Sequence, residues 1–171
     1  MIPARRHAVI TGAASGLGRA LAIRLGRDGW HVAVCDVDER GSRETASLVE
    51  RAGGTAQVER LDVTVPAEWE DLRGRLRRQW EVVDLLVNNA GVSGAGEVAR
   101  FPLDDWRWIL DVNLFGVIHG CHYFVDWLAE NPRGGHVVNT ASMAAVVSAP
   151  TMGGYNASKA AVVSLSETLY A

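Results

Sequence analysis

Residues 7–18 read HAVITGAASGLG, a short β-branched segment that runs into closely spaced glycines. The segment His7–Thr11 predicts a strand, and the apolar pattern through Leu17, Leu21 and Leu25 predicts the helix that follows. Glycines permit a tight turn and a close approach of the backbone to a ligand, and the amides that begin a helix attract anions. Strand, glycine turn and helix in this order therefore favour a site for a pyrophosphate.

A second apolar run, His31–Cys35, ends at the acidic residue Asp36. In dinucleotide-binding folds a carboxylate about 20 residues after the glycine turn hydrogen-bonds the adenosine ribose. A carboxylate would repel a 2′-phosphate, Val37 rather than an arginine follows it, and the glycine turn carries Ser15 where a basic residue could stand. These residues favour NAD over NADP. The alternative is that Asp36 only starts a turn or a helix.

The same alternation of strand and helix continues along the chain. Further apolar runs at 55–61, 82–87 and 135–141 predict strands, and helical patterns at 40–52, from Pro66 through Trp80, and at 110–130 separate them. This order predicts one α/β domain, a doubly wound parallel sheet of the Rossmann type. Asp62 and the asparagines at 88 and 89 follow strands, at the edge where such sheets bind ligands, although Asp62 could equally be a turn residue.

Composition excludes several classes of protein. With 171 residues, 48% of them hydrophobic and 22% charged, the chain is expected to fold as one globular domain. A net charge of -3 without a basic block argues against nucleic acid as a partner. No apolar run suits a signal peptide or a membrane span, so we expect a cytoplasmic protein. Cys35 and Cys121 lack metal-ligand spacing, which favours buried thiols and no metal site.

The stretch Tyr155-Asn156-Ala157-Ser158-Lys159 carries the chemistry. If it is helical, Tyr155 and Lys159 lie one turn apart on one face. A fixed ammonium beside a phenol favours the phenolate, so the pair suits a tyrosine that acts as a base. Ser142 follows the last predicted strand and would lie at the same edge of the sheet. An isolated YxxxK is, alternatively, an ordinary helix with an exposed lysine and a half-buried tyrosine.

The motifs together resemble those of the short-chain dehydrogenases/reductases, of the subgroup with TGxxxGxG and YxxxK. They are TGAASGLG at 11–18, Asp62, NNAG at 88–91, Asn113, Ser142 and YNASK at 155–159, and they cover the chain from Thr11 to its end. The resemblance implies an oxidoreductase that transfers a hydride between NAD(H) and a small secondary alcohol or ketone. A catalytically idle nucleotide-binding module, a sensor or a scaffold, is the alternative function.

The resemblance also implies a role for each motif residue. The catalytic residues would be Tyr155 as acid/base, Ser142 on the substrate oxygen, Lys159 on the nicotinamide ribose and the tyrosine, and Asn113 in a proton relay. The cofactor would contact Gly12, Ser15, Gly16, Leu17 and Gly18 at its pyrophosphate, Asp36 at its ribose, Asp62 and Val63 at its adenine, Asn89, Ala90 and Gly91 beside its adenosine, and Tyr155 and Lys159 at its nicotinamide end.

One departure from the family concerns the length of the chain. Members continue past the YxxxK helix with two further parallel strands and a substrate-covering segment, so we expect residues 1–171 to be a single domain without that C-terminal part. The fifth strand would then be an exposed sheet edge. The apolar helix at 110–130, together with the helix at 154–171, predicts a homo-oligomer, a dimer or a tetramer.

Overall fold

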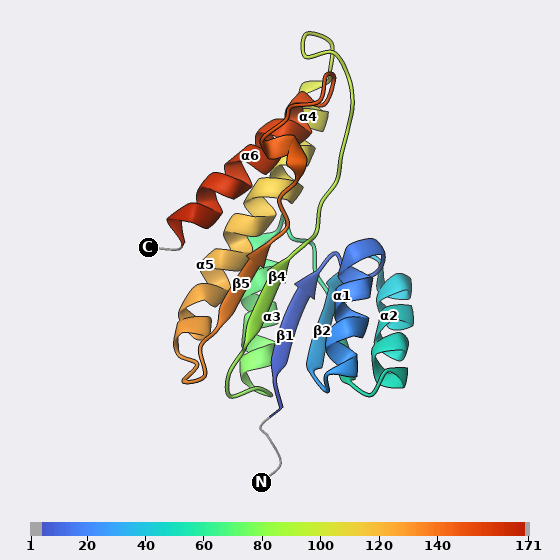
Figure 1. Cartoon of the computed structure of the whole chain (residues 1–171), viewed down its shortest axis with the longest axis vertical. Coiled ribbons are helices and arrows are strands. Elements are labelled where there is room, and N and C mark those ends of the chain that lie inside the picture. Colours follow the sequence, from blue (N-terminus) through green and yellow to red (C-terminus); the bar gives the residue numbers. More distant parts are fainter. Residues whose placement is uncertain (1–4, 170–171) are drawn as a thin grey trace.

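Five parallel strands form one sheet in the order β3-β2-β1-β4-β5 in the computed structural model, which describes residues 5–169 (Figure 1). The strands are β1 (His7–Thr11), β2 (His31–Asp36), β3 (Thr55–Arg60), β4 (Leu85–Asn88) and β5 (His136–Asn139). The helices are α1 (Gly16–Arg27), α2 (Glu39–Arg51), α3 (Pro66–Arg77), α4 (Leu103–Leu110), the π-helix η1 (Asp111–Phe115), α5 (Gly116–Ala129), the 3₁₀ turn η2 (Met143–Ala145) and α6 (Gly153–Thr168). The predicted doubly wound, Rossmann-like sheet is confirmed.

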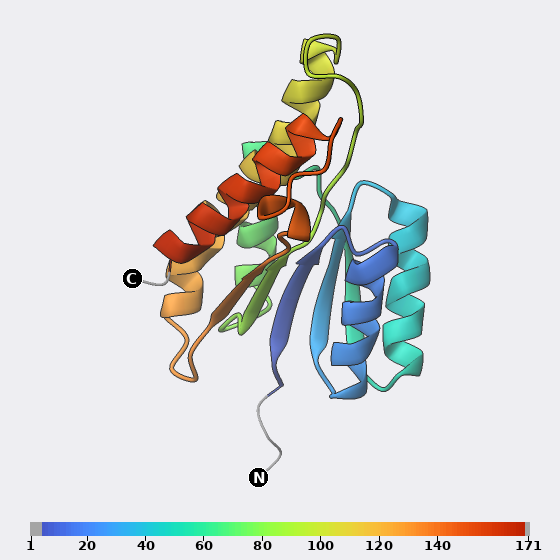
Figure 2. The same ribbon diagram turned by 45° about the horizontal axis from the view of Figure 1, so that its top comes forward.

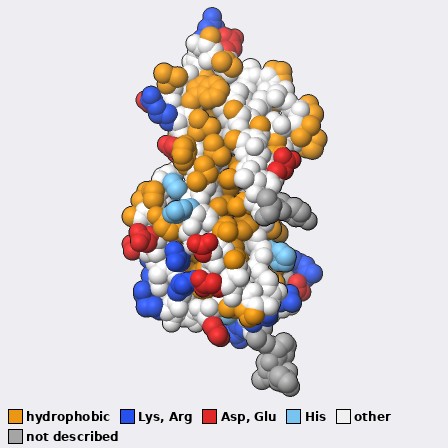
Figure 3. Space-filling view, turned by 90° about the vertical axis from the view of Figure 1, so that its left-hand side faces the viewer, with side chains coloured by type: hydrophobic (Ala, Val, Ile, Leu, Met, Phe, Trp, Pro, Cys, Tyr) orange, Lys and Arg blue, Asp and Glu red, His pale blue; other side chains and the backbone are white. Residues whose placement is uncertain are grey.

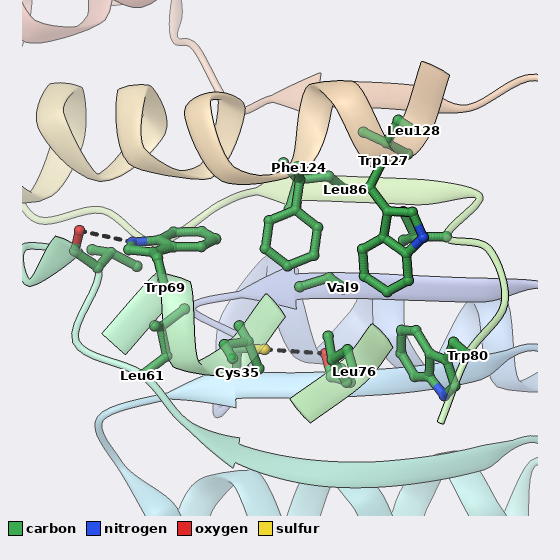
Figure 4. Close-up of a cluster of buried hydrophobic side chains, with 14 residues drawn as sticks. Val9, Cys35, Leu61, Trp69, Leu76, Trp80, Leu86, Phe124, Trp127 and Leu128 are labelled. Carbon is green, nitrogen blue, oxygen red and sulfur yellow. Dashed lines mark hydrogen bonds between the residues drawn. The ribbon is translucent and has the colours of Figure 1, made fainter. Parts of the chain in front are cut away.

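The central strands are apolar on both faces because helices cover both faces of the sheet. Ile10 of β1 packs with side chains of α1 and α2, whereas its neighbour Val9 packs with α3 and α5. Figures 1 and 2 show α1 and α2 standing together beside β1 and β2. The core between the sheet and helices α3 and α5 contains Trp69 and Phe124 in an edge-to-face contact, with ring centroids 5.9 Å apart (Figure 4). Trp69 of α3 and Trp80, which follows this helix, are therefore core residues.

The fourth strand begins later than its sequence predicted. Residues 82–87 read as a strand, but β4 spans Leu85–Asn88. Val83 is buried without joining the ladder, and the Asp84 carboxylate accepts the backbone N–H of His7 at 2.8 Å. A side chain thus supplies the bond that a strand carbonyl would otherwise make. The third and fifth strands are likewise shorter than the apolar runs that predict them.

The predicted long helix at 110–130 is interrupted at its start by η1 and continues as α5. Its apolar residues face two directions because two parts of the same chain cover them. Phe124 lies in the core with α3, whereas Val117 and Cys121 meet Val162 of α6. A subunit contact, which the sequence suggested as the reason, is therefore not needed for these residues. Assembly remains a prediction, for which Phe115, 47% exposed, is the best-placed apolar side chain on this helix.

The outer edge of β5 has no strand beside it within residues 5–169. A groove of about 530 Å³ runs along it between α5 and α6 and is lined by Val125, Leu128, Val137 and Leu169 among others. Figure 3 shows apolar side chains gathered on this side of the molecule. The predicted exposed edge is thus present, and the last two residues of the predicted 154–171 helix lie outside the described part of the chain.

Two further expectations concern cysteines and membranes. Cys35 and Cys121 are both buried free thiols, and burial raises the pKa of each. Across residues 5–169, none of the helices has the length and apolar character that crossing a bilayer requires.

Candidate active site

The turn between β1 and α1 has the geometry that its glycines predict. Gly12 and Gly16 have φ values of 63° and 54°, which residues with a side chain rarely adopt. A side chain on Gly18 would collide with the carbonyl oxygen of Gly12, so the helix can pack this closely only through glycine. Among the residues that the structure describes, none caps α1 with its side chain, and the first turn of α1 contains no acidic residue. The first amides of α1 are therefore open to an anion.

A cleft of about 600 Å³ lies at the carboxyl ends of the strands, beside this turn. It is lined by ten of the predicted cofactor residues, Gly12, Ser15, Gly16, Leu17, Asp36, Asp62, Val63, Asn89, Ala90 and Gly91. Gly18 is buried within α1 and is not in the lining. The sequence missed Val37, Leu61, Thr64, Val92, Trp108 and Val112, which also line the cleft. Val37, Leu61, Thr64 and Val92 are sequence neighbours of predicted residues. Trp108 of α4 and Val112 of η1 are distant in the sequence, and no pattern predicted them.

Two carboxylates on the cleft wall are held by neighbouring donors. Asp36 accepts the backbone N–H of Ala14 through Oδ2 and that of Asp38 through Oδ1, each at 3.0 Å. Asp62 accepts both the backbone N–H and the hydroxyl of Thr64 through Oδ1. A carboxylate oxygen accepts more than one hydrogen bond, so both acids keep capacity for a ligand. Asp36 thus bonds the glycine turn itself, a contact that its position in the sequence did not reveal.

Thr11 ties the end of β4 to the glycine turn. Its hydroxyl accepts the backbone N–H groups of Asn89 at 2.9 Å and Ala90 at 3.0 Å. The Asn89 amide in turn donates to the carbonyl oxygen of Thr11 at 3.0 Å. A second asparagine, Asn88, donates to Asn139 of β5 at 2.9 Å. The side-chain amides of Asn88 and Asn89 therefore join neighbouring strands at the cleft.

Tyr155 and Lys159 lie on one face of α6, as their spacing predicts. The Lys159 ammonium is 5.8 Å from the centre of the Tyr155 ring and donates to the carbonyl oxygen of Thr140 at 2.7 Å. Lys159 is 4% exposed, and burial lowers the pKa of its amine because desolvation disfavours the charged form. An ammonium has three donor hydrogens, and the Thr140 carbonyl takes one of them.

Asn113 is fully buried in η1 beside the lysine. Its Oδ1 accepts the backbone N–H of Val92 at 2.8 Å, and its Nδ2 donates to the Val92 carbonyl at 2.9 Å and to the Ser158 hydroxyl at 3.1 Å. Both hydrogens of the amide are thus committed within the protein. Ser158 gave no sign in the sequence that it joins this network. The side chain of Asn113 therefore holds the loop after β4 against α6.

Gly91 connects these residues to the cleft. It lies in the cleft lining, and a Cβ atom added to it would be 3.3 Å from Asn113 Oδ1 and 3.6 Å from Lys159 Nζ. A ligand in the cleft could approach both groups only because this position has no side chain. The structure thus brings Asn113 and Lys159 to the rim of the predicted cofactor site.

Ser142 reaches the same region from the end of β5. Its hydroxyl oxygen accepts the backbone N–H of Ala144 at 3.1 Å and so begins η2, which packs against α6. Within the described residues, Ser142 forms no hydrogen bond with Tyr155. The segment that follows is apolar and exposed at Met143, Val146 and Val147. Ser142, Asn113, Tyr155 and Lys159 are not in the cleft lining, but Lys159 lies next to Gly91 at its rim and Tyr155 lies next to Lys159 on α6. A glycine turn with open amides, acidic residues at strand ends and this lysine-tyrosine pair are suited to binding a dinucleotide and moving a proton.

Comparisons with known proteins agree with this geometry. The sequence profile of the family described as short chain dehydrogenase matches residues 6–171. EphD of Mycobacterium tuberculosis is 38% identical over 95% of this chain, and the 3beta-hydroxysteroid dehydrogenase 1 of Eggerthella lenta is 36% identical over 94% of it. A crystal structure of a short chain dehydrogenase/reductase from Burkholderia phymatum in complex with NAD is 42% identical and superposes with a TM-score of 0.92 over 97% of this chain.

These relatives are all longer than the present chain. It spans 27% of EphD, 62% of the hydroxysteroid dehydrogenase and 59% of the Burkholderia phymatum structure.

Proposed function

Because the chain belongs to the short-chain dehydrogenases, we propose that it is an oxidoreductase that uses NAD(H) on a secondary alcohol or ketone, with Tyr155 as the acid/base. The observation that carries the proposal is the Lys159 ammonium, 5.8 Å from the Tyr155 ring and beside Gly91 at the rim of the cleft. An alcohol needs a base for its proton at the place where its hydride leaves. The pair supplies that base.

The residues of the cleft fit a dinucleotide. The uncapped start of α1 suits the pyrophosphate, for which Gly12, Ser15, Gly16, Leu17 and Gly18 are the proposed contacts. Asp36 would hold the adenosine ribose, Asp62 and Val63 the adenine, and Asn89, Ala90 and Gly91 the adenosine side, with Lys159 and Tyr155 at the nicotinamide ribose. When bound, the nicotinamide ring would accept or give the hydride.

Asp36 supports NAD rather than NADP. Its carboxylate lies in the cleft wall, where it would repel a 2′-phosphate. The nearest cation along α1, Arg19, already donates to Thr45 at 2.9 Å and forms an ion pair with Glu44. Arg19 could therefore pair with a 2′-phosphate only by giving up these contacts.

The protein groups divide the proton chemistry among them. Ser142 would orient the substrate oxygen, and the Tyr155 hydroxyl would take the alcohol proton or return it to the ketone. Lys159 would favour the phenolate through its charge, which the Thr140 carbonyl holds in place. Asn113 would keep the loop after β4 against α6, and thereby keep Gly91 beside the lysine.

The exposed apolar segment after Ser142 favours an apolar substrate. Met143, Val146 and Val147 follow the residue that would hold the substrate oxygen. One relative is a 3beta-hydroxysteroid dehydrogenase, a protein named for an apolar secondary alcohol. We therefore expect activity on bulky apolar alcohols or ketones in the whole protein.

The test is Tyr155→Phe in the whole protein. Removing the hydroxyl should lower the rate of hydride transfer by about 10²- to 10⁴-fold, because the acid/base is lost. NAD binding, followed by the fluorescence of Trp108 in the cleft, should change little. Tyr123→Phe on α5 is the matched control and should leave both properties unchanged.

Two outcomes would contradict the proposal. Full turnover by the Tyr155→Phe variant would remove the assigned acid/base. A wild-type protein that binds NAD but transfers no hydride to any alcohol or ketone in a broad panel would instead favour an idle nucleotide-binding module.

A further inference from the structure

The four residues before α6 form a strained turn. Among residues 5–169, Thr151 is the only residue other than glycine with a positive φ, 65°. Met152 N donates to the carbonyl oxygen of Ala149 at 3.4 Å across Pro150 and Thr151. Proline second and a left-handed residue third are the pattern of a type II turn, whose third position favours glycine. A β-branched residue there is unusual and is sustained only by surrounding contacts.

The contacts that sustain the turn are hydrogen bonds from both of its sides. The hydroxyl of Thr151 donates to the carbonyl oxygen of Pro150 at 2.6 Å. The carbonyl oxygen of Thr151 accepts the backbone N–H of Gly96 at 2.7 Å, and Gly96 and Met152 are bridged partners. The turn therefore joins the loop after β4 to the start of α6, two segments that rise to the same end of the molecule in Figures 1 and 2.

Two aromatic rings make this junction close-packed. A Cβ atom on Gly96 would be 2.5 Å from the Phe101 ring, and one on Gly153 would be 3.0 Å from Trp106. Phe101 and Trp106 meet edge to face, with centroids 6.2 Å apart. A change in the turn would have to move these rings or break the bond between Gly96 and Thr151.

The turn also fixes the first turn of α6, where Tyr155 lies. The N-cap residue of this helix, Met152, makes no capping bond with its side chain in the described part of the chain. Instead, Asn156 donates its backbone N–H to the Met152 carbonyl at 2.8 Å and its side-chain amide to the Ala149 carbonyl at 2.9 Å. Both acceptors belong to the turn. The height and rotation of the Tyr155 side chain therefore depend on the conformation of residues 149–152.

We propose that Thr151 is a positioning residue, whose left-handed conformation clamps the loop at Gly96 and sets Tyr155 for proton transfer. This inference rests on the proposed function, in which Tyr155 is the acid/base that must be positioned. The backbone conformation, rather than a contact of the Thr151 side chain with substrate, carries the effect.

Three variants of the whole protein separate conformation from side chain. Thr151→Val keeps the shape but loses the bond to Pro150 and disfavours positive φ, so kcat should fall about tenfold with the KM for NAD unchanged. Thr151→Gly adopts positive φ freely and should keep kcat within about twofold of wild type. Thr151→Ser keeps the hydroxyl and should behave like wild type.

Hydrogen exchange gives a second measurement that does not depend on activity. The Gly96 amide should be protected in wild type and in Thr151→Gly, and should exchange about tenfold faster in Thr151→Val. This result would support the clamp even if the wild-type protein transferred no hydride, an outcome that would contradict only the proposed function.

Several outcomes would overturn the inference. Equal protection of the Gly96 amide in all variants would show that Thr151 does not hold the loop. A Thr151→Gly variant as impaired as Thr151→Val would assign the effect to the side chain. A Thr151→Val variant with wild-type kcat, or one whose loss lies in NAD affinity, would exclude positioning of Tyr155.

Discussion

The two ends of the sheet use polar residues in opposite ways. At the amino end, Asp84 is buried and its carboxylate accepts hydrogen bonds from the His7 backbone, from Asn131 at 3.0 Å and from Arg133 at 2.9 Å. At the carboxyl end, Asp36 lies in an open cleft and bonds only backbone amides among the described residues. Asp84 accepts hydrogen bonds from two side chains as well as from the backbone, whereas Asp36 keeps capacity for a ligand.

The pKa values at the two ends reflect the same difference. Burial by itself would raise the pKa of Asp84, but the hydrogen bonds from His7, Asn131 and Arg133 outweigh it and leave the pKa lowered. At the other end, burial lowers the pKa of the Lys159 amine, and no acidic group among residues 5–169 offsets this effect. The amino end therefore stabilises the fold, whereas the carboxyl end places charged groups where a ligand can use them.

The largest expected effect is at the amino end. Asp84→Ala removes the acceptor of Arg133, of the buried Asn131 amide and of the His7 backbone N–H. Because leaving buried donors unsatisfied costs about 1–3 kcal/mol each, the free energy of unfolding should fall by about 3 kcal/mol. Urea unfolding measures the loss. Asp84→Asn, which retains an acceptor, should lose less unfolding free energy. Equal stability of wild type and Asp84→Ala would show that Asp84 does not stabilise the amino end of the sheet.

The next largest effect is expected at the carboxyl end of the sheet, on the binding of the cofactor. Asp36→Asn keeps an acceptor for the Ala14 amide but removes the charge, so the preference for NAD over NADP should fall about tenfold while unfolding changes little. Titrating both cofactors against tryptophan fluorescence gives the ratio. An unchanged ratio would mean that Asp36 does not select the cofactor.

We expect a fall in pH to lower the free energy of unfolding through a histidine at the amino end of the sheet. Burial, with the nearby His7 and Arg5, lowers the pKa of His31 to about 4. A histidine with a lowered pKa stabilises the fold above its unfolded value of about 6.5, and that contribution is lost as the pH falls towards 4. The loss should be about 1 kcal/mol, because solvent screens a half-buried group.

Denaturant titrations at pH 7 and pH 4.5 measure this acid effect. His31→Phe retains the aromatic contact with Trp80 and should flatten the pH dependence. A pH dependence that is the same in the variant would place its origin elsewhere.

The smallest effect on stability is expected at Leu17. The sequence assigned this leucine both to the apolar pattern of the first helix and to the cofactor, and the structure leaves it 56% exposed in the cleft lining. Leu17→Ala should therefore change the unfolding free energy by less than about 0.5 kcal/mol. Weaker NAD binding in this variant, measured by the same titration, would be the sign of its role at the cleft.

Local patterns in the sequence predicted much of the fold and the site. The glycine turn, the acid after β2 and the helical spacing of Tyr155 and Lys159 depend on residues a few positions apart, and short-range geometry fixes such features. The order of strands and helices likewise follows from periodicity and from the right-handed connections of parallel strands.

Only the tertiary structure decided what distant segments do together. Gly91 lies beside Asn113 and Lys159. Thr151, which has a positive φ, is bonded to Gly96 in a distant loop, and the His7 amide bonds the carboxylate of Asp84 just before β4 begins. Each of these features depends on a contact with a residue far away in the sequence, which can offset an unfavourable local conformation. Periodicity and spacing report only on neighbouring residues, so they could not predict these contacts.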